Sequence, residues 1–242
     1  GDITPSEPGV VSGTDCNDDD NSVYPTATEV CDGQYNDCAV TGYDALGAPS
    51  DETDDDGDDY VECVIHSGGW DGLDVTIVDG GDCDDLSSAG AQTFPGAAAF
   101  ESSSTCMKDG DLDDYGDLFP TVSGVTAGND CNDAEPTVFP TASELCDGQY
   151  NDCSDALYVA SGAPTNETDN DSDGYVECTI DSGGWDRLSS LPRGGGDCDD
   201  TSATAATTYP GAAEYESSVI CMKDDDVDGF GDDSPLTGAV TS

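Results

Sequence analysis

The chain has 242 residues and carries 55 Asp and Glu against only 4 Lys and Arg, so its formal net charge is −51. A surface of this charge repels nucleic acid, which we exclude as a partner. Hydrophobic residues make up 35% of the chain and are scattered. No run approaches the roughly 18 apolar residues of a membrane span, so we expect no such span and little core.

The spacing of the cysteines indicates that the chain is built from repeats. Cys16, Cys31, Cys38, Cys63, Cys83 and Cys106 each recur 115 positions later, as from Cys16 to Cys131. Such regularity favours one fixed shape over the disorder typical of acidic segments. We predict repeat 1 at 1–115 and repeat 2 at 116–230, each with two related halves, and the start of a third repeat at 231–242. The chain is interpreted as a window on a longer tandem array, with copies of itself or neighbouring repeats as partners.

Within each repeat, the composition predicts little regular structure. Gly, Pro, Asp, Asn and Ser dominate, and they favour turns and loops over helix interiors. We predict a mostly irregular or small-β fold of tandem repeats, stapled by disulfides. Short strands are expected at 60–65, 75–78 and 175–180. One-turn helices are expected after Pro25, Pro95, Pro140 and Pro210, because proline suits the first helical position.

Six cysteines per repeat point to an oxidising compartment, and hence to an extracellular or cell-surface protein. Both halves of a repeat share one plan: acidic loop, spacer, Asp-Cys-(Asp/Asn)-Asp, aromatic-Pro, Cys. If the halves share ancestry, the predicted disulfides are Cys16–Cys31, Cys38–Cys63, Cys83–Cys106, Cys131–Cys146, Cys153–Cys178 and Cys198–Cys221. The chief alternative links Cys31 to Cys38 within the short loop that separates them.

Four acidic loops place Asp at alternate positions, which lets the carboxylates turn inward around one hard cation. Ca²⁺ accepts about six to eight oxygen ligands at irregular geometry. The spacing follows the first half of an EF-hand loop, but Pro120 and Pro235 stand where the closing Glu is needed. We therefore predict tandem calcium-binding repeats with several ions each. Their first ligands would be Asp54, Asp56, Asp58, Asp109, Asp111, Asp113, Asp117, Asp169, Asp171, Asp173, Asp224, Asp226, Asp228 and Asp232.

Further ligands are expected from clusters beside the cysteines. The Asp-Cys-(Asn/Asp)-Asp clusters supply Asp15, Asn17, Asp18, Asp82, Asp84, Asp85, Asp130, Asn132, Asp133, Asp197, Asp199 and Asp200. A third kind of cluster supplies Asp32, Asn36, Asp37, Asp147, Asn151 and Asp152, and the glutamates Glu29, Glu144 and Glu214 are additional candidates. Soft metals are disfavoured, because the chain has one His and two Met and its cysteines are expected to be oxidised.

These motifs resemble a known family. Asp-x-Asp-x-Asp-Gly-aromatic-Gly-Asp, Asp-Cys-Asp-Asp, Pro-Gly-Ala-x-Glu and Cys-Asp-Gly-x-x-Asn-Asp-Cys are similar to the metal-binding repeat of MopE-type secreted bacterial proteins, over nearly the whole chain. The resemblance implies an extracellular, repeat-built protein. One namesake of the family is associated with copper, but no residue of this chain carries that property over. The acidic loops also resemble, more loosely, thrombospondin type 3 calcium repeats.

The remaining features favour a structural role. No nucleophile–His–acid set exists in both repeats, because His66 becomes Asp181, so we expect no enzymatic activity. Trp70 and Trp185 are expected to pack rather than to bind sugar. Asn166 is the better of two glycosylation sequons, since Asn170 lies inside an acidic loop. We predict an extracellular structural protein, rigidified by calcium and disulfides, that forms a cell-surface stalk or filament. The alternative is a calcium-dependent adhesin or a metal-capturing module.

Overall fold

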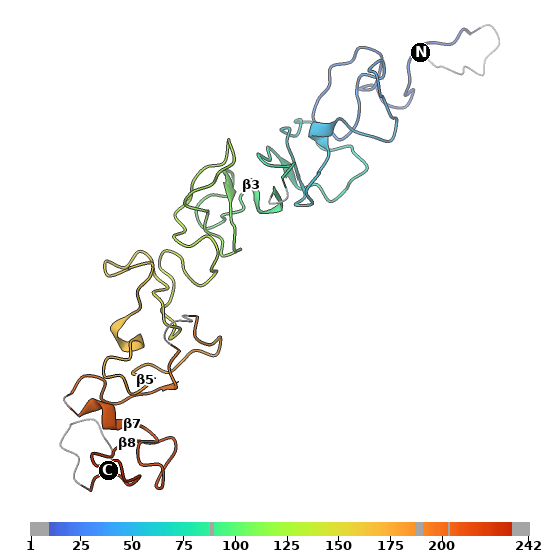
Figure 1. Cartoon of the computed structure of the whole chain (residues 1–242). Helices are drawn as coiled ribbons and strands as arrows, with labels where there is room; N and C mark the ends of the chain where they lie inside the picture. Colours follow the sequence, from blue (N-terminus) through green and yellow to red (C-terminus); the bar gives the residue numbers. More distant parts are fainter. Residues whose placement is uncertain (1–9, 88–89, 187–190, 203, 234–242) are drawn as a thin grey trace. The chain divides into compact units, whose positions relative to one another are not determined.

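The computed structural model describes residues 10–87, 90–186, 191–202 and 204–233 (Figure 1). By its internal contacts the chain divides into two compact units, Gly1–Pro136 and Thr137–Ser242. The predicted repeat boundary after residue 115 lies inside the first unit. A repeat can be framed from any starting point, so the 115-residue period is compatible with this division, and the predicted domain limits stay a prediction.

Regular structure is confined to very short elements, which confirms the predicted fold class. Unit 1 contains η1 (Ser50–Glu52), β1 (Tyr60–Val61), β2 (Asp79–Gly80), η2 (Gly90–Gln92), β3 (Thr93–Pro95) and β4 (Cys106–Lys108). Unit 2 contains η3 (Thr165–Glu167), β5 (Tyr175–Val176), β6 (Gly194–Gly195), η4 (Ala205–Thr207), β7 (Thr208–Pro210) and β8 (Cys221–Lys223). Among the described residues there is no α-helix, and every η element is one turn of 3₁₀ helix.

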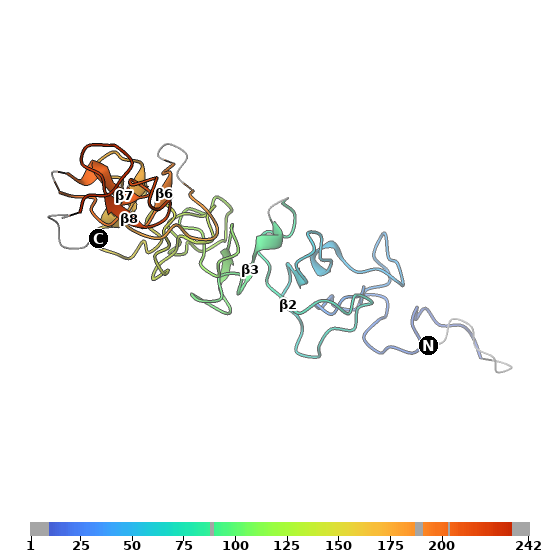
Figure 2. The same cartoon turned by 90° about the horizontal axis from the view of Figure 1, so that it is seen from below.

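The strands form four two-stranded sheets, two in each unit. β1 pairs in parallel with β2, and β3 pairs antiparallel with β4. Unit 2 repeats this pattern with β5 beside β6 and β7 beside β8, the latter pair visible in Figure 2. The register is also kept, because Tyr60 lies opposite Asp79 and Tyr175 lies opposite Gly194, each pair shifted by the repeat period.

The strands and helices differ from the sequence prediction in extent and place. The strands predicted at 60–65 and 175–180 are reduced to two residues each, and 75–78 forms no strand. No helix follows the four named prolines. Thr26 and Thr141, directly after Pro25 and Pro140, have φ of 69° and 67°, a left-handed conformation that a right-handed helix cannot contain. Pro95 and Pro210 end strands β3 and β7 instead.

The apolar core is small. Val23, Val61, Val138 and Val176 are at most 2% exposed, but their buried neighbours include many carboxylates and amides, such as Asn36, Asp85 and Asp130. Aromatic pairs add local packing: Tyr60 stacks on Phe94 with ring centroids 4.8 Å apart, and Tyr175 stacks on Tyr209 at 5.0 Å. Cross-links therefore have to supply much of the stability that a small core lacks.

The disulfides correct the predicted pairing. The structure pairs Cys16 with Cys38 and Cys31 with Cys63 in unit 1, and Cys146 with Cys178 in unit 2. Predicted pairs Cys16–Cys31, Cys38–Cys63, Cys131–Cys146 and Cys153–Cys178 are therefore wrong, and so is the alternative Cys31–Cys38. Predicted pairs Cys83–Cys106 and Cys198–Cys221 are confirmed. Cys131 and Cys153 are both disulfide-bonded and correspond to Cys16 and Cys38 under the 115-residue shift.

A buried glutamate supports the Cys31–Cys63 pairing. Glu52 Oε2 accepts hydrogen bonds from the backbone N–H of Asp32 (3.1 Å) and of Gly33 (2.7 Å), which draws the segment after Cys31 toward η1. The N–H of Cys63 in turn donates to the carbonyl of Asp51 (3.1 Å), so the Cα atoms of Cys31 and Cys63 lie 5.9 Å apart. The half-repeat that contains Cys83 lacks the Cys-Asp-Gly-x-x-Asn-Asp-Cys loop. The assumed equivalence of the two halves therefore failed.

Candidate metal centres

The first aspartate of each acidic loop shapes the loop. Asp54 accepts hydrogen bonds from the N–H of Gly57 (2.6 Å) and of Asp59 (3.1 Å). Asp109, Asp169 and Asp224 accept bonds from the backbone in the same way. A carboxylate that binds several N–H groups of its own loop bends the backbone around itself. This bending directs the following side chains toward one side.

In three of the four acidic loops, the third aspartate divides its two oxygens between the protein and the centre of the loop. Asp58 Oδ1 accepts the N–H of Tyr60 (2.8 Å), and Asp113 and Asp173 bond the N–H of Tyr115 and Tyr175 in the same way. In the described part of the chain, the Oδ2 atoms of these three aspartates are buried without a hydrogen-bond partner.

The Asp-Cys-x-Asp clusters are brought to these loops by the backbone. The N–H of Asp82 donates to the carbonyl of Val61 (3.0 Å), directly after the first acidic loop. Asp197 donates to Val176 in the same way, and Asp130 donates to Gly116, each at 3.0 Å. The N–H of Asp55 also donates to Asp85 Oδ1 (2.7 Å). Carboxylates from two segments that are far apart in the sequence therefore meet at one place.

Three centres result, which we number sites 1 to 3. Site 1 comprises Asp54, Asp56, Asp58, Asp82 and Asp85; site 2 comprises Asp109, Asp111, Asp113 and Asp130; site 3 comprises Asp169, Asp171, Asp173, Asp197 and Asp200. Within site 1, ligand oxygens of Asp56, Asp82 and Asp85 lie within 4.8 Å of one another. Sites 1 and 2 lie in unit 1 and site 3 in unit 2.

Buried carboxylate oxygens without partners mark all three sites. Over the described residues, these atoms are both oxygens of Asp56, both of Asp111, and the Oδ2 atoms of Asp58, Asp82, Asp85, Asp113, Asp130, Asp171, Asp173 and Asp197. Asp85, Asp130 and Asp200 are at most 1% exposed. An anionic oxygen buried with no donor is costly, so these clusters fit a bound cation that the protein itself does not supply.

The pKa shifts agree with this geometry. Burial away from water raises the pKa of Asp58, Asp130 and Asp173 to about 7. It raises the pKa of Asp56, Asp85, Asp113 and Asp197 to about 6, with neighbouring carboxylates adding to the effect. Desolvation and like-charge repulsion both disfavour the ionised form. A cation at the centre of each cluster would remove both penalties.

The donor set consists of hard oxygens. The groupings that bring Cys83 and Cys106 near Asp82, and Cys198 and Cys221 near Asp197, offer no thiolate because these cysteines are disulfide-bonded. His66 is exposed, and its Nδ1 accepts the N–H of Gly68. Carboxylate oxygens suit Ca²⁺, Mg²⁺ or Mn²⁺ rather than copper.

Several predicted ligands are engaged elsewhere. Asp117 binds Lys108 Nζ (2.5 Å) and the N–H of Gly110, and Asp232 binds Lys223 Nζ (3.4 Å). Asp84 and Asp199 accept the hydroxyls of Ser87 and Ser202. Asp133 accepts the N–H of Leu118. These side chains form hydrogen bonds or ion pairs within the protein.

The third cluster forms a hydrogen-bonded node. Asn36 Nδ2 donates to Asp32 Oδ2 (3.0 Å), and Glu29 accepts the N–H of both Asn36 and Asp37. The equivalents Asp147, Asn151, Asp152 and Glu144 make the same bonds in unit 2. Their role as metal ligands stays a prediction, as it does for Asp15, Asn17, Asp18, Asn132, Glu214, Asp224, Asp226 and Asp228. Glu214 is exposed.

Sequence reasoning missed three kinds of residue around the sites. Glu52 and Glu167 bind the backbone beside the buried node, Lys108 and Lys223 pair with an aspartate of the acidic loop, and Glu101 and Glu216 accept the N–H of Gly116 and Gly231. Each pair is separated by the repeat period. Identity under the 115-residue shift was therefore the signal that could have found them.

Comparison with known proteins agrees with the repeated motif. A family model described as a putative metal-binding motif, Cu-binding MopE, matches residues 15–41, 82–98, 130–157 and 197–233. No curated protein and no solved structure matches the chain. No helix in the described ranges is long and apolar enough to span a membrane. The chain thus carries four segments that match this putative metal-binding motif, as the resemblance to MopE-type proteins predicts.

Proposed function

We propose that the chain is an extracellular structural repeat protein whose acidic loops bind calcium. The observation that carries the proposal is a set of buried carboxylate oxygens without hydrogen-bond partners in the described structure. They lie where an acidic loop meets an Asp-Cys-x-Asp cluster. Calcium bound there would neutralise carboxylates that otherwise repel one another. The disulfides Cys83–Cys106 and Cys198–Cys221 fix one side of sites 1 and 3, while the loop backbone positions the other side.

Several parts of this function go beyond the motif itself. The disulfides are consistent with an oxidising, extracellular location. A period kept over two copies suits an array that stiffens when ions bind, and so a stalk or filament at the cell surface. We also propose a non-enzymatic role, since the abundant carboxylates serve the clusters. A calcium-dependent adhesin or metal-capturing module is the alternative, and it would bind its partner or release its ion without changing the stiffness of the chain.

Asn166 is proposed as a glycan acceptor. Its side chain is exposed in η3, whereas the amide of Asn170 donates to Asp200 Oδ2 and to the carbonyls of Thr165 and Thr168. Glycopeptide mass spectrometry of native material would show a sugar on the peptide with Asn166. An unmodified Asn166 in all native material would contradict the assignment.

Calcium removal tests the main proposal. We expect excess EDTA to lower the melting temperature and to open the acidic loops to protease, and Ca²⁺ to reverse both effects. A variant with Asp56, Asp111 and Asp171 changed to Asn should lose this response. A control with the exposed Asp44, Asp114 and Asp155 changed to Asn, with the same change in charge, should keep it. Unchanged melting and digestion in EDTA would refute calcium binding.

A further inference from the structure

Sites 1 and 3 are built from the same residues, which makes them a natural comparison. Each aspartate of site 1 has its counterpart in site 3 under the 115-residue shift, from Asp54 and Asp169 to Asp85 and Asp200. The hydrogen bonds that shape them also match. The N–H of residue 55 donates to Asp85 Oδ1 at 2.7 Å, and the N–H of residue 170 donates to Asp200 Oδ1 at 2.7 Å.

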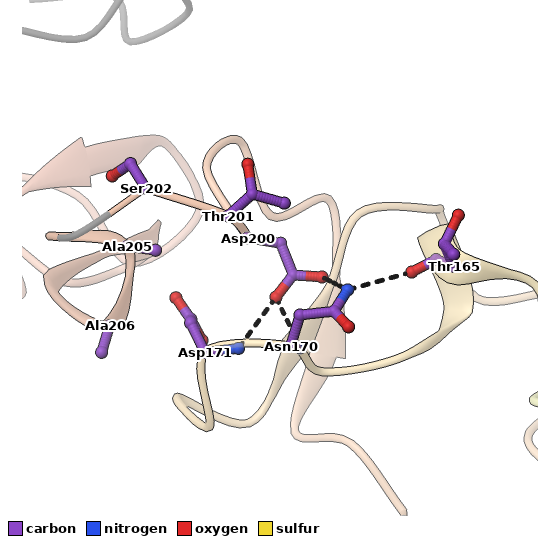
Figure 3. Close-up of a pocket in the computed structure, with 8 residues that line it drawn as sticks. All are labelled: Thr165, Asn170, Asp171, Asp200, Thr201, Ser202, Ala205 and Ala206. Atoms are coloured by element: carbon purple, nitrogen blue, oxygen red, sulfur yellow. Dashed lines mark hydrogen bonds between the residues drawn. The ribbon is translucent and has the colours of Figure 1, made fainter.

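The two acidic loops differ at three positions, where Asp55, Gly57 and Asp59 of repeat 1 correspond to Asn170, Ser172 and Gly174 of repeat 2. The first of these differences changes a side-chain contact to a site aspartate. The Asn170 amide donates to Asp200 Oδ2 (2.9 Å) and to the carbonyl of Thr165 (3.2 Å), as the dashed lines in Figure 3 show. Asp55 has no side-chain donor at neutral pH, and Asp85 Oδ2 is buried without a partner in the described structure.

This difference changes what each site offers to a cation. At site 1, Asp85 contributes an unpartnered oxygen to the group with Asp56 and Asp82, and Asp55 adds a negative charge next to it. At site 3, the second oxygen of Asp200 is already bonded to an amide. An open cleft of about 580 Å³ lies beside this pair, lined by Asn170, Asp171, Asp200 and Ser202 (Figure 3). The Oδ2 atom of Asp200 therefore has one lone pair fewer to offer to a cation than that of Asp85.

We propose that residue 55 in repeat 1 and residue 170 in repeat 2 set unequal cation affinities for two sites built from the same five aspartates, with site 1 the tighter. The inference rests on the proposed calcium function. It is independent of which ligands complete each shell. Calcium sites are tuned by ligand count and charge, and one additional nearby carboxylate and one freed oxygen correspond to about a fivefold to tenfold difference in affinity. The chain would then fill its sites in a fixed order as calcium rises.

Site-resolved titration tests the order of filling. The Gly57 N–H bonds to Asp54 in site 1, and the Gly174 N–H bonds to Asp169 in site 3, so their amide NMR signals report each site separately. In the oxidised full chain titrated with Ca²⁺, the Gly57 signal should reach its midpoint at about fivefold to tenfold lower free Ca²⁺ than the Gly174 signal. Equal midpoints, or the reverse order, would overturn the inference.

Exchanged residues test the cause. Asp55→Asn should move the Gly57 midpoint to higher Ca²⁺ by about fivefold to tenfold, and Asn170→Asp should move the Gly174 midpoint to lower Ca²⁺ by a similar factor. Asp51→Asn is the matched control: it removes the same charge from exposed η1, where repeat 2 has Asn166. A host without N-glycosylation leaves this control unmodified.

The outcomes separate the two proposals. A shift from Asp51→Asn as large as that from Asp55→Asn would overturn the inference, because the amide contact to Asp85 would then be irrelevant. Binding that is present but unchanged in both exchange variants would overturn it too, while leaving calcium binding intact. Amide signals that do not respond to Ca²⁺ in the wild-type chain would overturn the calcium function itself.

Discussion

Replacing Asp130 by Asn should stabilise the ion-free protein and reduce the stabilisation that calcium adds. Asp130 is fully buried in site 2, and its Oδ2 has no partner among the described residues. Its Oδ1 accepts the N–H of Asn132 (3.0 Å), a bond that the carbonyl oxygen of an asparagine can keep. The substitution therefore removes a buried charge while preserving the local backbone.

The magnitude follows from the pKa of Asp130. Burial, with the nearby Asp113 and Asp111 charges, raises this pKa from 3.8 to about 7. An acid with a raised pKa binds its proton more tightly in the folded state, so ionisation costs stability at higher pH. About three pKa units correspond to roughly 4 kcal/mol above pH 7, an upper value, and the cost vanishes below about pH 4. We expect Asp130→Asn to recover roughly 2 to 4 kcal/mol in EDTA at pH 7.5.

Urea unfolding at pH 7.5, in EDTA and in saturating Ca²⁺, measures both effects. Calcium should stabilise wild type more than the variant and so narrow or cancel the difference, because a ligand at 100 times its Kd contributes about 2.7 kcal/mol and the variant has lost part of its site. Asp114→Asn is the control, since Asp114 is an exposed residue of the same loop. A variant that is less stable than wild type in EDTA would refute the reasoning that Asp130 is a buried, uncompensated charge.

The remaining predictions concern pH, cross-links and a buried glutamate. Calcium affinity measured by calorimetry should rise from pH 5 to pH 7.5, because Asp58, Asp130 and Asp173, with pKa near 7, must lose protons to bind. Stability in EDTA should fall over the same window, because the folded chain binds more protons than the unfolded chain, and a flat profile in both measurements would contradict the shifts. A non-reduced digest should yield peptides joining Cys31 to Cys63 and Cys146 to Cys178, and a peptide joining Cys31 to Cys38 would contradict this connectivity. Glu167→Ala should cost roughly 2 to 4 kcal/mol in urea unfolding, because two buried N–H groups lose their acceptor. At pH 7.5 Glu167→Gln, which keeps a carbonyl oxygen there and removes a buried charge whose pKa burial raises to about 7, should cost no stability, and equal losses in both variants would argue against this role.

The sequence predicted which residues form the sites better than it predicted which of their oxygens have no hydrogen-bond partner. Alternating aspartates and the Asp-Cys-x-Asp clusters were visible as motifs, because local spacing encodes them. Which oxygens would stay unpartnered was not visible: Asp113 and Asp117 are predicted ligands of the same loop, yet Asp113 keeps an unpartnered oxygen in the described structure while Lys108 pairs with Asp117. That distinction depends on contacts between side chains, which a spacing pattern does not contain.

The disulfide pairing shows the same limit at longer range. Internal similarity of the two halves predicted Cys83–Cys106 correctly and Cys16–Cys31 wrongly. Beside the observed Cys31–Cys63 bond, Glu52 ties Asp32 and Gly33 to η1 across about 20 residues. Spacing does not encode this contact, and only the recurrence of Glu52 as Glu167 marked it in the sequence.

The positions of the cross-links along the chain have a mechanical consequence. In unit 1, two overlapping disulfides enclose residues 16–63, and a third encloses 83–106. None of these three disulfides spans residues 64–82 or the stretch after 106. Site 1 joins Asp54, Asp56 and Asp58 to Asp82 and Asp85 across the first gap, and site 2 joins Asp109 to Asp130 across the second. Under tension and without a bound ion, a segment as long as 64–82 could extend to roughly 60 Å. The carboxylate clusters therefore lie where the chain would otherwise stretch, and calcium would set its extensibility while the disulfides limit how far it can yield.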